Sequence, residues 1–530
     1  MSMRTVGFFF FALGLLAVTG ELCGIDFPTA RWFFAACRQV PLLHLKVGSE
    51  NILWFGWLSS AILIFGGLWI FVRSFTRGSP NPVTLRRIRR FKEIKRGYFS
   101  LLILLCLGGL AALDQIIVGN EALAVRYMGK WTFPAFTPEL FKGSDFGITG
   151  ERADAPVDFR ELKIALKKQR AISHGKVIMP LIPFAATNDT LDIRSREMVQ
   201  REGLYYESGS KEPYSGLAAR YHDPENIHFH LRFTLRKGIL SGPVDGWDAA
   251  DARVYGAEYR KGELVKEKEK FIGEGSLEDF LSIGSQEMRA VKYHPAPPIP
   301  EEGNLLGTTS QGNDVLAYLY GGLQVNFKAA LIFLPIVYIL GVIIGMLMGY
   351  FGGWFDLIAD RIIEVFSNMP FLFVVIIISS MVPEHFKGLP TILTILIVFG
   401  WMGIAALMRT AAYHDKERDY ISAARVLGAG TPRIILRHLL PNTVAIIVTI
   451  VPFTMSGLIS SLTALDYLGF GLPPEYATWG RLLNDGLSNL SAPWLVSSTF
   501  FALVTLLVLI TFIGEAIREA FDPKQYSYYR

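Results

Sequence analysis

The chain has 530 residues, of which 51% are hydrophobic and 19% charged, and its formal net charge is +5. Its mean hydropathy is positive, at +0.34, and its apolar residues gather in blocks of about 20, the length that crosses a bilayer. This composition excludes an ordinary set of soluble domains.

Eight apolar blocks predict a mainly α-helical membrane protein. They are apolar on every face rather than along one stripe, which distinguishes them from the surface helices of soluble domains. The first block could instead be the core of a signal peptide. The blocks lie at about 6–20, 52–72, 99–118, 324–349, 362–382, 390–410, 439–464 and 494–516.

The placement of positive charge predicts the topology. Segment 73–96 carries nine Lys and Arg residues and one Glu, and such residues accumulate on the cytoplasmic side of a membrane. A nucleic-acid-binding arm is the alternative, but a topology signal is the better explanation of a basic segment between two spans. Counting spans from there places 119–323 and 466–493 outside, and 411–438 and the C-terminus in the cytoplasm.

Segment 21–50 lies outside under either interpretation of the first block. It contains Cys23 and Cys37, and a disulfide between them could persist in an oxidising compartment. Two unpaired thiols are the alternative.

The long outside segment 119–323 predicts a domain of mixed α and β structure. Its run IHFHLRFTL alternates as a strand does, which puts His228 and His230 on one face, with His222 nearby. A metal site is conceivable there, but solvated strand histidines are the preferred interpretation, and we expect no metal.

Several catalytic motifs are absent from the sequence. No G-x-x-x-x-G-K-[ST] phosphate loop occurs, so this chain should not hydrolyse ATP. No H-E-x-x-H, paired C-x-x-C or G-x-S-x-G occurs either. The sequence therefore predicts neither an enzyme nor a chain with its own cofactor.

The loop DYISAARVLGAGTPRIILRHLLPN, residues 419–442, predicts two short helices joined by a bend. The first should end at Gly428, because glycine readily adopts the left-handed conformation found at helix ends. The second should begin with Thr431 as N-cap and Pro432 as first helical residue. An ordinary re-entry loop is the alternative.

This loop resembles the EAA coupling loop of ABC-importer permeases, whose pattern is E-A-A, then Gly, then I-x-x-x-x-L-P. Ser422 stands where the family usually has Glu. The resemblance implies that the matching residues couple the chain to ATPase subunits. They are Ala423, Ala424, Gly428, Ile435, Leu440 and Pro441.

Further motifs resemble the dipeptide/oligopeptide class of these permeases. They are Leu306-Gly307-Thr308 with Gly312 and Asp314-Val315-Leu316, GYFGG at 349–353, LDYLGFG at 465–471, and Ala492-Pro493-Trp494. The outside segment 125–147 and the tail 513–523 are similar to the second permease subunit of Yej-type importers, which carry oligopeptides and microcin C. The resemblance covers about 85–190 and 295–525.

The resemblance implies a type I ABC-importer transmembrane fold with about eight membrane helices and a large periplasmic α+β insertion. The expected parts are two additional helices at 1–75, a basic segment and first core helix at 76–118, a scoop-like periplasmic domain at 119–323 with an insertion at about 190–295, and a permease core at 324–530 with its coupling loop at 411–441.

It also implies a place in the bacterial inner membrane and a set of partners. These are membrane lipid, a second permease subunit in a heterodimer, two ATPase domains that bind ATP and Mg, and a periplasmic peptide-binding protein, with no nucleic acid. Contacts with the binding protein are expected at Arg126, Tyr127, Trp131 and Asp145.

Within the spans, Gly341, Gly345 and Gly349 recur every four residues and predict close packing against a neighbouring helix. Glu364 and Asp466 are candidates to line the substrate path, because a charge near hydrocarbon is costly without a role. Interfacial caps or subunit contacts are the alternative for both. The competing function is a secondary transporter or channel, but the duplicated, broken helices typical of that class are not evident.

Overall fold

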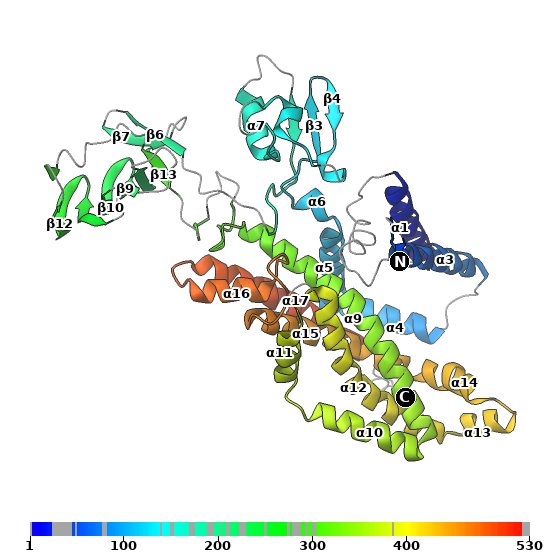
Figure 1. Cartoon of the computed structure of the whole chain (residues 1–530). Helices are drawn as coiled ribbons and strands as arrows, with labels where there is room; N and C mark the ends of the chain where they lie inside the picture. The colour runs from blue at the N-terminus through cyan, green and yellow to red at the C-terminus, as the bar shows by residue number, and fades with distance from the viewer. Residues whose placement is uncertain are drawn as a thin grey trace. The chain divides into compact units, whose positions relative to one another are not determined.

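The structure is a computed structural model (Figure 1). It describes residues 3–23, 45–47, 50–76, 82–137, 140–148, 153–168, 175–187, 196–201, 203–207, 213–221, 229–248, 252–272, 276–277, 288–291, 295–298, 304–383 and 386–521. The chain forms two compact units. The first comprises Met1–Asp189, Pro298–Gly307 and Asn313–Arg530, and the second comprises Thr190–Pro297 and Thr308–Gly312.

Within the described residues, seven helices of the first unit are long and apolar enough to cross a membrane. They contain all or most of seven of the eight predicted blocks, and the block predicted at 99–118 ends early because α5 stops at Ala112. They are α1 (Met3–Cys23), α3 (Trp54–Thr76), α5 (Lys95–Ala112), α9 (Val315–Phe351), α12 (Leu389–Lys416), α15 (Leu440–Tyr467) and α17 (Pro493–Phe521).

The remaining block, predicted as one span at 362–382, does not form a single straight helix. It falls on two helices, α10 (Gly353–Ser367) and α11 (Phe371–Met381), whose axes differ by 82°. Pro370 precedes α11 and lacks the N–H group that would continue the hydrogen-bond ladder of α10. The pair is therefore a broken span or a re-entrant loop.

The predicted glycine stripe on α9 is confirmed as a packing surface for α12. A Cβ atom at Gly341 would lie 2.7 Å from Cβ of Ile404, and one at Gly349 would lie 2.6 Å from Cβ of Ala412. The backbones of the two helices approach closely because no side chain separates them.

The N-terminal helices α1 and α3 also pack through glycine. A Cβ atom at Gly7 would lie 2.6 Å from the backbone nitrogen of Phe71. Cys23 ends α1, is exposed and has no disulfide among the described residues. Cys37 lies outside those residues, so the disulfide remains a prediction. A short hairpin follows, formed by β1 (Leu45–Val47) and β2 (Glu50–Ile52).

The basic segment forms α4 (Pro82–Glu93), which lies beside the end of α17. The guanidinium carbon of Arg87 is 4.6 Å from the ring centroid of Phe521. Arg96, at the start of α5, has Nη1 3.4 Å from a carboxylate oxygen of Glu515. The basic segment and the C-terminal end of α17 therefore lie on the same side of the helix bundle.

A small mixed domain follows α5 and the short helix α6 (Asp114–Ile117). Its three-stranded sheet has the order β4-β3-β5, and Phe146, Phe159 and Leu162 are buried in its core. Its elements are β3 (Ala124–Tyr127), β4 (Lys130–Thr132), η2 (Pro134–Phe136), η3 (Gly143–Phe146), α7 (Phe159–Lys168) and β5 (Lys176–Ile178).

The second unit is an eight-stranded antiparallel sheet with the order β12-β11-β10-β9-β8-β13-β6-β7. Leu235 and Tyr255 are fully buried in its core. Its strands are β6 (Arg196–Arg201), β7 (Leu204–Glu207), β8 (Gly216–Tyr221), β9 (Phe229–Arg236), β10 (Ile239–Trp247), β11 (Arg253–Arg260), β12 (Glu263–Glu269) and β13 (Arg289–Val291).

The histidines considered for a metal belong to this unit. His230 lies on β9 and is buried, which corrects the expectation of a solvated strand position for this residue. His222 and His228 lie outside the described residues. Among the residues that are described, no group of three His, Cys, Asp or Glu side chains could hold a metal ion.

Candidate functional site

The loop after α12 folds as a helix and a glycine bend, as predicted (Figure 1). The first helix is α13 (Asp419–Val426). Gly428 has φ of +80°, which an L-amino acid rarely adopts. The N–H of Gly428 donates to the carbonyl of Arg425 at 2.9 Å, and the N–H of Ala429 donates to the carbonyl of Ala424 at 3.0 Å. The bend is thus a well-formed helix stop.

Two details of the second helix differ from the prediction. The N-cap of α14 (Thr431–Ile434) is Gly430 and not Thr431. The helix is also not a separate short element, because a π-helical turn, η6 (Ile435–Leu439), joins it to α15. A single helical rod therefore runs from the bend into the membrane span, and π turns of this kind frequently occur at functional sites.

One face of the loop is packed onto the bundle. Ile421, Ile434 and Leu439 are almost completely buried in a cluster with Met408 and Ala412 of α12. The amide of Asn442 donates to the hydroxyl of Tyr420 at 2.7 Å, which joins α15 to α13. These contacts hold the loop against the spans.

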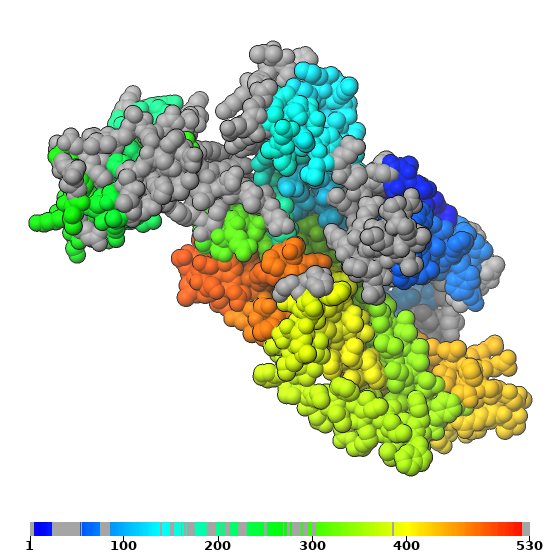
Figure 2. All heavy atoms as spheres, in the orientation of Figure 1, coloured from blue at the N-terminus to red at the C-terminus, as the bar shows by residue number. Residues whose placement is uncertain are grey.

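The remaining surface of the loop is uncovered and exposes three large apolar side chains together with three arginines. Val426 is 88% exposed, Leu427 86% and Leu436 65%. Figure 2 shows the lobe formed by α13 and α14 in yellow-orange, with its outer surface open. Three large apolar side chains around a rigid bend are typical of a surface that a partner covers.

The six residues matched to the EAA pattern divide between these two faces. Ala424 is buried, and Ile435 and Leu440 are partly buried. Ala423, Gly428 and Pro441 are exposed. The pattern thus contains both residues that fix the loop and residues that form its uncovered surface.

A cluster of charges beside the loop was missed by sequence reasoning. Arg409 of α12 donates to both carboxylate oxygens of Asp356, from Nε at 2.6 Å and from Nη2 at 2.8 Å. Its Nη1 donates to Asp360 at 2.8 Å, and the hydroxyl of Tyr413 donates to Asp356 at 2.6 Å. Asp356 is 6% exposed. This cluster, the Arg409 cluster, joins α10 to the end of α12 that leads into α13.

A sequence signal for this cluster exists. Arg409 follows a long apolar run, and an ionisable residue in such a run requires a partner. The same argument applies to Lys328 of α9, which sequence reasoning also missed.

The two candidate pathway residues have different surroundings. Glu364 is half exposed on α10 and pairs with Arg361 one turn earlier. Asp466 is buried at the end of α15, and its carboxylate accepts the N–H of Leu472 at 2.7 Å. A Cβ atom at Gly480 would lie 2.7 Å from Cβ of Asp466. Asp466 thus fixes the connection to α16 (Trp479–Ser488), and a pathway role for either residue stays a prediction.

The four residues expected to contact a binding protein share the small mixed domain. Arg126 and Trp131 form a cross-strand pair on β3 and β4, with the guanidinium 5.9 Å from the ring centroid, and both are exposed. Tyr127 is partly buried and packs on Phe146. Asp145 accepts the N–H of Lys142 at 2.9 Å and so caps η3. Arg126, Trp131 and Asp145 are thus exposed, and only Tyr127 of the four is partly buried.

Known proteins similar to this chain are transport-system permeases. The family described as binding-protein-dependent transport system inner membrane component matches residues 341–525. The inner membrane ABC transporter permease protein YejE of Escherichia coli (strain K12) is 32% identical over 445 residues, covering 84% of this chain and 98% of the relative. The peptidoglycan transport system permease protein YejE of Agrobacterium fabrum is 40% identical, covering 84% and 94%.

A relative that matches less of the chain is the dipeptide transport system permease protein DppC of Bacillus subtilis. It is 34% identical over 248 residues, which are 46% of this chain and 76% of the relative.

The bundle of apolar helices with its packed loop is that of a multi-pass membrane permease. The chain belongs to the family of inner-membrane components of binding-protein-dependent transport systems, and within it to the YejE-type permeases. The predicted fold class and family are thereby confirmed. The relatives are named as permease proteins, which agrees with the predicted class of protein.

Proposed function

We propose that this chain is one permease subunit of an ATP-driven importer of peptides. The observation that carries this proposal is the uncovered apolar surface of Val426, Leu427 and Leu436 on a loop that is otherwise packed into the bundle. Such a surface fits the apolar groove of a partner subunit, and this chain has no phosphate loop of its own. Membership in a family of transport permeases supports the assignment.

The class of substrate is inferred from the relatives. Their names assign them to dipeptide, oligopeptide and peptidoglycan transport. Short peptides and peptide-containing cell-wall fragments share a backbone with charged ends. We therefore assign oligopeptides to this chain as cargo, with microcin C-like peptide conjugates as a further candidate.

The proposed assembly contains a second permease subunit, two ATPase domains and a periplasmic binding protein. ATP and Mg bind to the ATPase domains, and their closure moves the docked loop. Because α14, η6 and α15 are one rod, a displacement at the bend reaches the span directly. The exposed Arg126 and Trp131 pair is the proposed contact for the loaded binding protein.

The proposed orientation puts the loop and the C-terminus in the cytoplasm. Basic α4 lies beside the end of α17, and basic segments remain on the cytoplasmic side. The expected periplasmic side then carries the small mixed domain.

The variant Leu427→Asp tests the docking of ATPase subunits. The substitution removes a central apolar contact and places a carboxylate in the apolar groove of the partner. Central contacts of this kind contribute about 2 kcal/mol or more to binding. We therefore expect the amount of ATPase that copurifies with the full chain to fall by at least about tenfold.

Leu181→Asp is the matched control, because Leu181 is 83% exposed and lies in the small mixed domain. It should leave copurification unchanged. Normal ATPase recovery with Leu427→Asp would contradict the docking proposal.

A further inference from the structure

A pocket lies where α5 breaks into α6 beside α9. Two backbone carbonyls at the break are satisfied by side chains of α9. The hydroxyl of Tyr320 donates to the carbonyl of Leu110 at 2.6 Å, and the amide of Gln324 donates to the carbonyl of Ala111 at 2.9 Å. These two hydrogen bonds therefore stabilise the break between α5 and α6.

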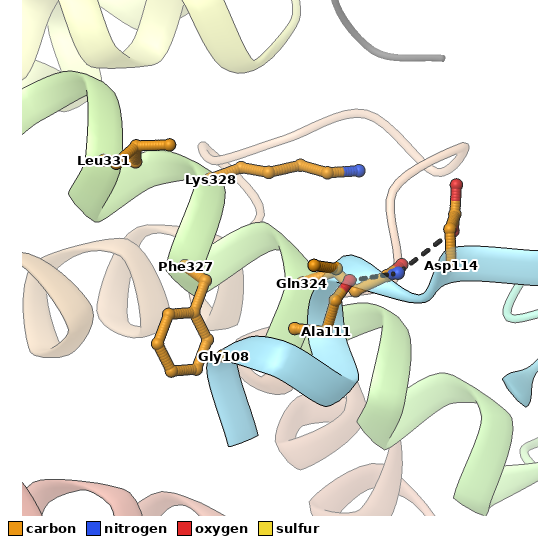
Figure 3. A pocket seen from close by; sticks show the side chains of 8 residues that line it. Gly108, Ala111, Asp114, Gln324, Phe327, Lys328 and Leu331 are labelled. Carbon is orange, nitrogen blue, oxygen red and sulfur yellow. Dashed lines mark hydrogen bonds between the residues drawn. The ribbon is translucent and has the colours of Figure 1, made fainter. Parts of the chain in front are cut away.

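The pocket has a volume of about 190 Å³ and contains charges of both signs. Asp114 accepts a hydrogen bond from Gln324 at 3.0 Å. Lys328, one turn further along α9, extends toward the side of the pocket where Asp114 lies (Figure 3). Lys328 forms no ion pair with any residue that the structure describes. The lining residues are Gly108, Ala111, Ala112, Asp114, Gln324, Phe327, Lys328 and Leu331.

The two charges face one small space without neutralising each other directly. A group that carries one positive and one negative charge would satisfy both. Lys328 lies near the end of the apolar part of α9. Removing water from its ammonium group costs free energy unless such a group binds there.

The helices that form the pocket carry exposed apolar side chains, as lipid-facing surfaces do. Leu331 is 60% exposed and Leu105 is 61% exposed, and both lie on helices that span the membrane. The pocket is also smaller than the roughly 300–1,000 Å³ of dedicated small-molecule sites. It suits a headgroup whose remaining bulk lies outside better than a whole peptide.

We infer that this pocket binds the headgroup of an ethanolamine phospholipid. Lys328 contacts the phosphate, and Asp114 accepts hydrogen bonds from the headgroup ammonium. The acyl chains extend over the apolar surface at Phe327 and Leu331. A choline headgroup has no N–H donor for Asp114, and an anionic headgroup is repelled by it.

The test is native mass spectrometry of the delipidated full chain in detergent. It is titrated in turn with phosphatidylethanolamine, phosphatidylcholine and phosphatidylglycerol of identical acyl chains. We expect the ethanolamine lipid to be retained about tenfold more strongly than the other two, as two charge-assisted contacts permit.

Substitutions at Lys328 and Asp114 locate the binding site. Because Lys328 contacts the phosphate that all three lipids share, Lys328→Met should weaken the retention of all three and Lys328→Arg should restore it, while Lys163→Met, at an exposed lysine of α7, should leave retention unchanged. Asp114→Asn should remove the preference for ethanolamine over choline, and should one of the two variants fail to fold, the other still provides a test. Equal retention of all three lipids by the unmodified chain would overturn the inference, as would undiminished retention by Lys328→Met or a preference that survives Asp114→Asn.

Discussion

Replacing Arg409 with Met is expected to destabilise the chain and to separate ATP hydrolysis from uptake. The substitution leaves the carboxylate of Asp356 buried without its cation, and breaking such a pair costs about 3 to 5 kcal/mol. The lower figure applies, because the Arg409 side chain is 28% exposed. Thermal unfolding of the purified chain in detergent measures the first effect.

The second effect follows from the position of the Arg409 cluster. It ties α10 to the end of α12 that leads into α13, so its loss lets the loop move without α10. We expect the ATPase rate of the assembled transporter to become independent of peptide-loaded binding protein, while uptake into proteoliposomes falls at least about tenfold.

Arg361→Met is the matched control for this prediction. Arg361 contacts Asp360 and Glu364, but its side chain is 64% exposed. Exposed ion pairs contribute roughly 0 to 1 kcal/mol, so stability and coupling should remain close to those of the unmodified chain. A stable, fully coupled Arg409→Met transporter would show that the cluster has no such role.

Replacing Gly345 with Ala is expected to disrupt the packing of α9 against α12. The added methyl group would overlap the backbone carbonyl of Ala405 and lie 2.8 Å from Cβ of Met408. Because a backbone atom cannot rotate away, the two helices must separate. Overpacking of this kind costs about 1 to 3 kcal/mol, which thermal unfolding in detergent measures.

Gly403→Ala makes the same chemical change on α12, where nothing lies within 4 Å of the added atom. It should alter stability by less than about 1 kcal/mol, in the stabilising direction, because alanine favours helix. Equal unfolding temperatures for the Gly345→Ala and Gly403→Ala variants would contradict the close approach of α9 and α12.

The sequence predicted the spans well, because their signal is local. A block of about 20 apolar residues has few alternatives to a membrane helix, and a helix stop at Gly428 needs only a residue that tolerates positive φ. The break between α10 and α11 was missed although Pro370 was visible, because composition alone does not reveal a change of helix direction. The N-cap error of one residue at Gly430 is of the usual size for helix ends.

The parts that sequence reasoning could not reach depend on distant residues meeting. Asp356 and Arg409 are far apart in the chain, and their pairing follows from how α10 lies on α12. The position of β13 between β8 and β6 likewise depends on long-range strand pairing. Lys328 and Asp114 share a pocket only because α9 crosses the end of α5.

Peptide uptake by proteoliposomes tests the central claim most directly. The chain is reconstituted with its second permease subunit, with or without the ATPase subunits, and ATP is supplied on the side of the basic α4 helix. The account predicts uptake only when ATPase subunits, ATP and loaded binding protein are all present. Peptide movement by the permease subunits alone, driven by an ion gradient, would contradict it.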